Sequence, residues 1–107
     1  TSQIQKYQKG QEFKLHHDYF DPEADPTFFA NGQRTWTFMV YLSDVEEGGT
    51  TKFPRVDTTL NPKKGQAVAW CNVFSDGKLD SDTLHQGSPV DKGEKYIITK
   101  WFKDKKD

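Results

Sequence analysis

The segment TWTFMVYL, residues 35–42, is the part of the sequence that most clearly decides the fold. Aromatic, β-branched and aliphatic residues fill it, and no glycine, proline or charged residue interrupts it. Residues of these types are enriched in β-strands, and a short apolar run is typical of a strand in a protein core. The segment therefore predicts a largely buried β-strand.

Other segments of similar character lie on both sides of this strand, and turn residues such as Gly, Pro, Asn and Asp separate them. The expected strands cover residues 11–20, 35–42, the second half of 44–54, 67–74, 83–90 and 95–102. Helix signals are poor, and two polar segments, 21–34 and 75–82, predict long loops. Short strands joined by turns predict an all-β sandwich or barrel.

Length and composition restrict the possible classes of protein. The 107 residues fit one domain, spanning 1–107. The net charge of -1 at pH 7 argues against nucleic acid as the main partner, and no apolar run approaches the roughly 18 residues of a membrane span. Cys71 is the only cysteine, so no disulfide can form within the chain. A cytoplasmic location is slightly favoured, and the oligomeric state stays open.

The segment QEFKLHHDYF, residues 11–20, contains the first group of residues that suggests chemistry. Strand alternation predicts His16 and Asp18 on one face, and Phe13 and His17 on the other. An imidazole and a carboxylate on one face suit a divalent metal ion that takes nitrogen and oxygen ligands. The competing interpretation is a pair of ordinary surface polar residues, and for this pair alone it is the better one.

The third histidine of the chain, His85, lies in TLHQGSPV, residues 83–90. With His16 and Asp18 it would complete a set of two histidines and one carboxylate, which is diagnostic of non-haem Fe(II) oxygenases. Lys95 follows ten residues later, across a turn, and could anchor the far carboxylate of a bidentate 2-oxo acid. The simpler interpretation of His85 is a half-buried structural histidine. The simpler interpretation of Lys95 is that it is one of many exposed lysines.

Four segments together resemble the prolyl 4-hydroxylase catalytic domain, which belongs to the 2-oxoglutarate- and Fe(II)-dependent dioxygenases. These segments are YQKGQEFKLHHD (7–18), RTWTFMVYLSDVEEGGTTKFP (34–54), LNPKKGQAVAWCN (60–72) and LHQGSPVDKGEKYIITKWF (84–102). Their order and spacing agree throughout, so the resemblance covers nearly the whole chain. It implies a double-stranded β-helix, or jelly roll, of two antiparallel sheets. It also implies hydroxylation of a peptidyl proline to 4-hydroxyproline, with succinate and CO2 as co-products.

The resemblance also implies roles for individual residues. It makes His16, Asp18 and His85 the ligands of Fe(II). Lys95 matches the lysine that binds the outer carboxylate of the co-substrate 2-oxoglutarate. Ascorbate is a further candidate cofactor, and a proline-containing peptide or protein is the expected partner.

Four further residues match the family pattern beside these ligands. Tyr7 and Thr51 match a tyrosine and a threonine that line the co-substrate pocket, where their hydroxyls could donate to a carboxylate. Arg34 and Trp101 match residues near the substrate side. In isolation each has a plain structural interpretation. Tyr7 could be a packed aromatic residue and Thr51 a turn residue. Arg34 could be a charge at a loop end, and Trp101 a core residue.

The chain also departs from the family pattern. The family commonly has tyrosine where this chain has Phe13, so a hydroxyl that could contact the substrate is absent. Family catalytic domains usually carry further N-terminal strands and helices, and we expect this chain to be a minimal or N-terminally truncated form. Gly48 and Gly49 are expected to allow a tight turn beside the site. The loops 21–34 and 75–82 are expected to cover a peptide groove.

Two alternatives stay open at this point. The same chemistry could act on lysine, another side chain or a small molecule, although related lysyl hydroxylases tend to have arginine in place of Lys95. The chain could instead be a jelly-roll module that binds metal without turnover. A pure metal-binding module has no need of Lys95, Tyr7 and Thr51 at the family spacing, which favours the enzyme.

Overall fold

The computed structural model describes residues 2–21 and 32–104, and these residues form strands with two short 3₁₀ turns. In chain order the strands are β1 (Ser2–Tyr7), β2 (Phe13–His16), β3 (Arg34–Tyr41), β4 (Glu47–Gly48), β5 (Thr51–Phe53), β6 (Thr58–Leu60), β7 (Ala67–Cys71), β8 (His85–Gly87), β9 (Val90–Lys92) and β10 (Lys95–Lys103). The 3₁₀ turns are η1 (Pro54–Val56) and η2 (Ser81–Thr83). Within the described ranges, no helix has the length and apolar character needed to cross a membrane. The prediction of an all-β fold is confirmed.

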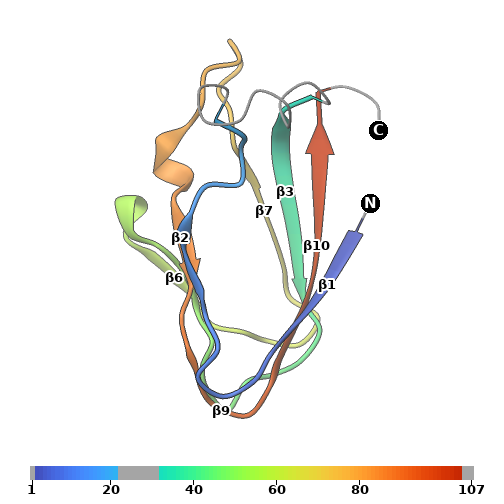
Figure 1. Cartoon of the computed structure of the whole chain (residues 1–107), viewed down its shortest axis with the longest axis vertical. Helices are drawn as coiled ribbons and strands as arrows, with labels where there is room; N and C mark the ends of the chain where they lie inside the picture. Colours follow the sequence, from blue (N-terminus) through green and yellow to red (C-terminus); the bar gives the residue numbers. More distant parts are fainter. Residues whose placement is uncertain (1, 22–31, 105–107) are drawn as a thin grey trace.

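Two antiparallel four-stranded sheets lie face to face (Figure 1). The first has the strand order β1-β10-β3-β7 and the second has the order β2-β8-β5-β6. A two-stranded sheet, β4-β9, completes the fold where the two layers meet, near the label β9 in Figure 1. Strands that are neighbours in each sheet are often far apart in the sequence, as expected for the predicted jelly roll.

Strand β3 occurs within one residue of its predicted position, but only one of its faces is buried. Met39 and Tyr41 point inward and form the hydrophobic core with Ile97 of β10. On the outer face, Trp36 and Phe38 are 48% and 43% exposed among the described residues. The expectation of a largely buried strand therefore holds for the inner face alone.

The strand registers bring the candidate site residues together. In the first sheet, Tyr7 of β1 is the register partner of Lys95 of β10. In the second sheet, His16 of β2 is the partner of His85 of β8. Each pair joins residues nearly seventy or more positions apart in the chain, so the antiparallel pairing itself assembles the site.

The alternation predicted for residues 11–20 is wrong for Phe13, although His16 and Asp18 do lie together. The register of β2 against β8 shifts between Phe13 and His16, and such an irregularity breaks the two-residue period of side chains. Phe13 and His16 consequently share a face, and their rings stack at a centroid distance of 3.8 Å. His17 lies outside the cluster of His16, Asp18 and His85, and its Nε2 contacts the backbone oxygen of Ser81 at 3.2 Å.

Other predicted segments differ in extent. Strand β7 ends at Cys71, so the segment 67–74 is a strand only in its first part. The segment 83–90 contains the end of η2, strand β8 and the start of β9. Pro89 lies between those two strands, and proline has no N–H to donate to a sheet. Most of the predicted loop 21–34 lies outside the described residues.

Gly48 ends β4 and Gly49 follows it, so the tight turn expected here is an extended connection between β4 and β5. Their φ angles are 76° and 66°, a left-handed conformation that residues with a Cβ rarely adopt. A Cβ on Gly48 would lie 2.4 Å from the backbone oxygen of Pro89. A Cβ on Gly49 would lie 3.3 Å from the Cδ atom of Lys95. Gly48 and Gly49 therefore pack directly against the segment from Pro89 to Lys95.

Candidate metal and co-substrate site

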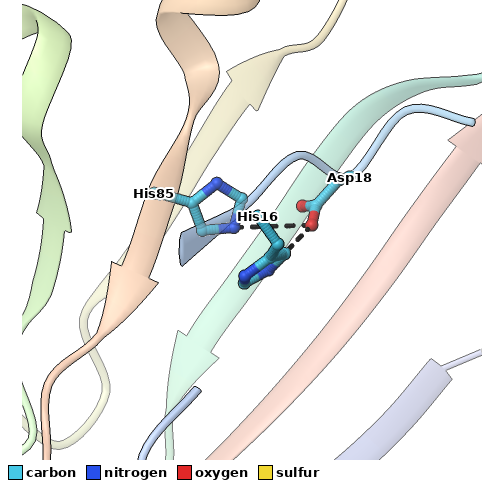
Figure 2. A group of neighbouring side chains, drawn as sticks. All are labelled: His16, Asp18 and His85. Atoms are coloured by element: carbon cyan, nitrogen blue, oxygen red, sulfur yellow. Dashed lines mark ion pairs between the residues drawn. The ribbon is translucent and has the colours of Figure 1, made fainter. Parts of the chain in front are cut away.

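His16, Asp18 and His85 form the only group of three potential metal ligands found within residues 2–21 and 32–104. His16 ends β2, Asp18 follows two residues later, and His85 begins β8. Their ligand atoms all lie within 4.8 Å of one another. Figure 2 shows both histidine rings directed at the carboxylate, with Nε2 of His16 at 3.3 Å and Nε2 of His85 at 3.4 Å from the same oxygen, Oδ1.

Backbone carbonyl groups determine which nitrogen of each ring carries the proton. Nδ1 of His16 lies 2.7 Å from the oxygen of Lys14, and Nδ1 of His85 lies 2.7 Å from the oxygen of Thr83. A carbonyl oxygen can only accept, so each Nδ1 donates its proton to the backbone, and Nε2 is the nitrogen of each ring that faces Asp18.

Two Nε2 atoms and a carboxylate oxygen thus converge on one point. Protons on the ring nitrogens, or a metal ion in their place, offset the negative charge of the carboxylate. Two imidazoles and one carboxylate are also the donor set of non-haem Fe(II) sites. The residues present therefore fit a divalent cation such as Fe(II).

Asp18 is buried, with 6% of its surface exposed. Burial alone would raise the pKa of its carboxyl group, but the side chains of His16, His85 and Thr37 outweigh this effect and hold the pKa well below the usual range. Asp18 is therefore ionised at neutral pH, which is the form that binds a metal ion.

Aromatic side chains surround the candidate ligands. The rings of Phe53 and Trp70 lie 5.2 Å and 4.9 Å from that of His85, and Phe13 stacks on His16. These contacts fix the orientation of both imidazoles. Phe53 and Trp70 were not predicted as site residues, although the alternation of their short strands could have placed them on the inner face.

Lys95 is the second chemically unusual feature of the site. It is only 4% exposed, and burial lowers the pKa of its ammonium group to about 8. Among the described residues, no carboxylate forms an ion pair with it; its Nζ instead lies 5.3 Å from the ring centre of Tyr7 and 6.0 Å from that of Tyr41. A buried charge without a counter-ion is unfavourable, so this position suits an anionic ligand.

Thr51 is held by a residue that sequence reasoning missed. The hydroxyl groups of Tyr41 and Thr51 lie 2.7 Å apart and both residues are buried. Tyr41 lies two residues after the core residue Met39 in β3, so both side chains point inward. The alternation of that strand could have identified Tyr41. Tyr41 also lies near Lys95, because the ring centre of Tyr41 is 6.0 Å from Nζ of the lysine.

One cavity joins these features. Its lining includes the three candidate metal ligands, the three predicted co-substrate residues and Trp101. Phe13 also lines it and remains 40% exposed, so the position that departs from the family pattern belongs to the site. Arg34 does not line the cavity: its guanidinium carbon lies 4.0 Å from the ring centre of Trp101 and 4.7 Å from that of Phe20.

Comparisons with known proteins agree with this geometry. Among curated proteins, the chain is 38% identical over 117 residues to a probable prolyl 4-hydroxylase 9 of Arabidopsis thaliana, and 40% identical over 103 residues to prolyl 4-hydroxylase subunit alpha-2 of Gallus gallus. These matches cover 94% and 96% of the chain, but the chain spans only 40% and 19% of the two relatives.

A solved structure and a family model extend these similarities. The 2OG complex of a viral collagen prolyl hydroxylase from Paramecium Bursaria Chlorella virus-1 superposes with a TM-score of 0.82 at 36% identity. The superposition covers 99% of this chain and 62% of the viral one. The model of the 2OG-Fe(II) oxygenase superfamily matches residues 2–103. With nearly every described residue inside that match, the chain belongs to the 2OG-Fe(II) oxygenase superfamily.

Proposed function

We propose that this chain is a catalytic domain that hydroxylates peptidyl proline to 4-hydroxyproline, using Fe(II) and 2-oxoglutarate and releasing succinate and CO2. The observation that carries the proposal is one cavity. It holds a cluster of two histidines and an aspartate, and also a buried lysine that has no carboxylate partner among the described residues. The similar proteins named prolyl 4-hydroxylase and collagen prolyl hydroxylase support proline as the target.

His16, Asp18 and His85 would hold the iron. The carbonyl groups behind the two rings direct both Nε2 atoms to the metal position, and the low pKa of Asp18 keeps its carboxylate ionised. When bound, Fe(II) together with 2-oxoglutarate supplies the activation of dioxygen. The chain itself provides the ligands, their orientation and a pocket walled by aromatic side chains.

Lys95 would bind the outer carboxylate of 2-oxoglutarate. Its ammonium group is protonated below pH 8 and lacks a carboxylate partner within the described ranges, so an incoming dianion would pair with it. Tyr7 and Thr51 line the same cavity and offer hydroxyl donors. Tyr41 bonds to Thr51 and would orient its hydroxyl group.

Trp101 and Phe13 would form the substrate side of the pocket. Both line the cavity, and a flat aromatic surface suits the apolar ring of proline. Arg34 stacks on Trp101 from outside the cavity, so we assign it a positioning role toward the indole ring.

An assay for succinate tests the proposal. The chain is incubated with 2-oxoglutarate and ascorbate, with and without Fe(II), and with either a proline-rich or a lysine-rich peptide. We expect Fe(II)-dependent succinate with the proline-rich peptide, a mass increase of one oxygen atom, and 4-hydroxyproline after acid hydrolysis. Oxidation of the lysine-rich peptide alone would support the alternative substrate. A folded, metal-bound chain that forms no succinate would support a binding module without turnover.

A further inference from the structure

The two oxygens of the Asp18 carboxylate have different surroundings. Oδ1 faces Nε2 of both histidines (Figure 2). Oδ2 accepts a hydrogen bond of 2.7 Å from the hydroxyl group of Thr37, in the middle of β3. Thr37 is only 1% exposed, so water does not compete for this bond. One oxygen therefore faces the metal site and the other is already occupied.

A buried asparagine continues this arrangement away from the site. Nδ2 of Asn72 donates to the hydroxyl oxygen of Thr37 at 2.9 Å, and Asn72 is 0% exposed. Its backbone is fixed as well, because its N–H donates to the oxygen of Thr35 at 2.7 Å and its own oxygen accepts from the N–H of Asp80 at 3.0 Å. Asn72 follows β7, which pairs with β3, so the sheet sets the position of both side chains.

The direction of each hydrogen bond follows from chemistry. An ionised carboxylate only accepts, so the single hydroxyl proton of Thr37 must point to Asp18. The oxygen of Thr37 can then only accept from its other neighbour, and Asn72 must present its NH2 group. The order Asn72 to Thr37 to Asp18 thus has one consistent arrangement of protons.

We propose that Thr37 and Asn72 are positioning residues that keep Oδ2 of Asp18 away from the metal, so that Asp18 binds it through Oδ1 alone. Carboxylates can bind metal ions through one or both oxygens. A second aspartate oxygen would occupy one of the positions that a site with three protein ligands leaves open. This inference rests on the proposed function in treating Asp18 as a metal ligand, but its test needs no turnover.

A purely structural role explains Asn72 less well. Its Oδ1 atom is buried without a hydrogen-bond partner among the described residues. Leaving a buried polar atom unpaired is unfavourable, and an apolar side chain would fill the same core position without that loss. The bond from Nδ2 to Thr37 gives this side chain a purpose that packing alone does not.

Binding of Co(II) by metal-free protein tests the proposal, with calorimetry for affinity and visible absorption for coordination geometry. Thr37→Val keeps the shape of the side chain but removes the donor. We expect it to weaken Co(II) binding by roughly 10- to 100-fold, as is typical when the partner of a metal ligand is lost, and to change the absorption spectrum. Thr37→Ser restores the hydroxyl and should restore both. Asn72→Leu should shift both in the same direction as Thr37→Val.

Thr35→Val is the matched control, because Thr35 lies on the same strand and its hydroxyl donates to the oxygen of Phe102, not to the site. Wild-type affinity and spectrum in folded Thr37→Val would overturn the proposal. If that variant does not fold, the same result in Asn72→Leu would overturn it. Wild-type protein that binds no Co(II) would instead refute the metal site of the proposed function.

Discussion

Lys95 brings a positive charge into the protein interior, and its charge state should control co-substrate binding. Burial lowers its pKa to about 8, so the ammonium form dominates below that pH and is lost above it. Burial raises the pKa of the neighbouring Tyr7 and Tyr41 above 10, so both stay neutral in this range. We expect the Kd of Mn(II)-loaded protein for 2-oxoglutarate to rise by up to about tenfold per pH unit above pH 8.

Calorimetry between about pH 6.5 and 9.5, in steps of about half a pH unit, checks this expectation. Lys95→Met is the control: its affinity should be low at every pH and should lack the wild-type slope. A wild-type Kd that stays constant up to pH 9 would show that Lys95 does not anchor the co-substrate.

The same residue predicts an opposition between stability and binding. The pKa of Lys95 is lower in the folded state than the ordinary 10.5, so the charged lysine opposes folding below pH 8. This opposition fades as the pH rises from about 8 towards 10.5, because only the unfolded state then stays protonated. Lys95→Met should therefore raise the free energy of unfolding at pH 7, by on the order of 2 kcal/mol.

Urea unfolding of metal-free protein at pH 7 and pH 9.5 measures this effect. The difference between Lys95→Met and wild type should be clearly smaller at the higher pH. A variant that is less stable than wild type at pH 7 would mean that the contacts of the ammonium group with the rings of Tyr7 and Tyr41 outweigh the cost of burying its charge.

At the scale of structural elements, the connection between β4 and β5 is sensitive to a single methyl group. Gly48→Ala and Gly65→Ala both place a Cβ on a residue with positive φ, which disfavours the fold by about 1–2 kcal/mol. Nothing lies within 4 Å of a Cβ on Gly65, whereas a Cβ on Gly48 would meet backbone oxygen of Pro89 at 2.4 Å. We expect Gly48→Ala to lower the free energy of unfolding by at least about 1 kcal/mol more than Gly65→Ala. If urea unfolding gives both variants the same loss of unfolding free energy, the close packing of Gly48 against Pro89 is contradicted.

The elements also show how far the sequence could predict the structure. The composition of β3 alone located that strand, because its apolar run has no competing turn residues. The shift between Phe13 and His16 left no such mark, since no glycine or proline accompanies it. The predicted alternation consequently placed Phe13 on the wrong face.

The candidate site was predictable where a residue type is chemically distinctive. Histidines, an aspartate and a lysine at family spacing indicated the metal and co-substrate positions, and the structure brings these residues into one cavity. Thr37, Tyr41 and Asn72 are ordinary residue types in or beside strands. Their contacts depend on the pairing of β3 with β7 and on the facing sheet, which no local pattern specifies.

At the scale of the whole molecule, a metal ion should act as a cross-link. His16 and His85 lie on different strands, and Asp18 lies beyond the end of the first of them, so the complete set of ligands exists only in the folded protein. Co(II) at 100 times its Kd should add about 2.7 kcal/mol to the free energy of unfolding. Thermal unfolding with and without Co(II) measures the resulting rise in Tm.

Two histidine variants make this measurement specific. His85→Ala should lose the stabilisation by Co(II), since it removes one of three ligands. His17→Ala should keep it, because His17 contacts the backbone of Ser81 and lies outside the cluster. Equal stabilisation of both variants would refute the assignment of the cluster as the metal site.

The carbonyl-held histidine rings have a consequence for metal identity. Both Nε2 atoms and Oδ1 of Asp18 converge in the folded protein, so they offer two nitrogen ligands and one oxygen ligand to any divalent ion of suitable size. Such donor sets bind Ni(II), Cu(II) and Zn(II) more tightly than Fe(II). Protein isolated from cells would then carry whichever of these ions was abundant there. The metal content of a freshly purified sample would then reflect the ions that the protein met during growth and purification.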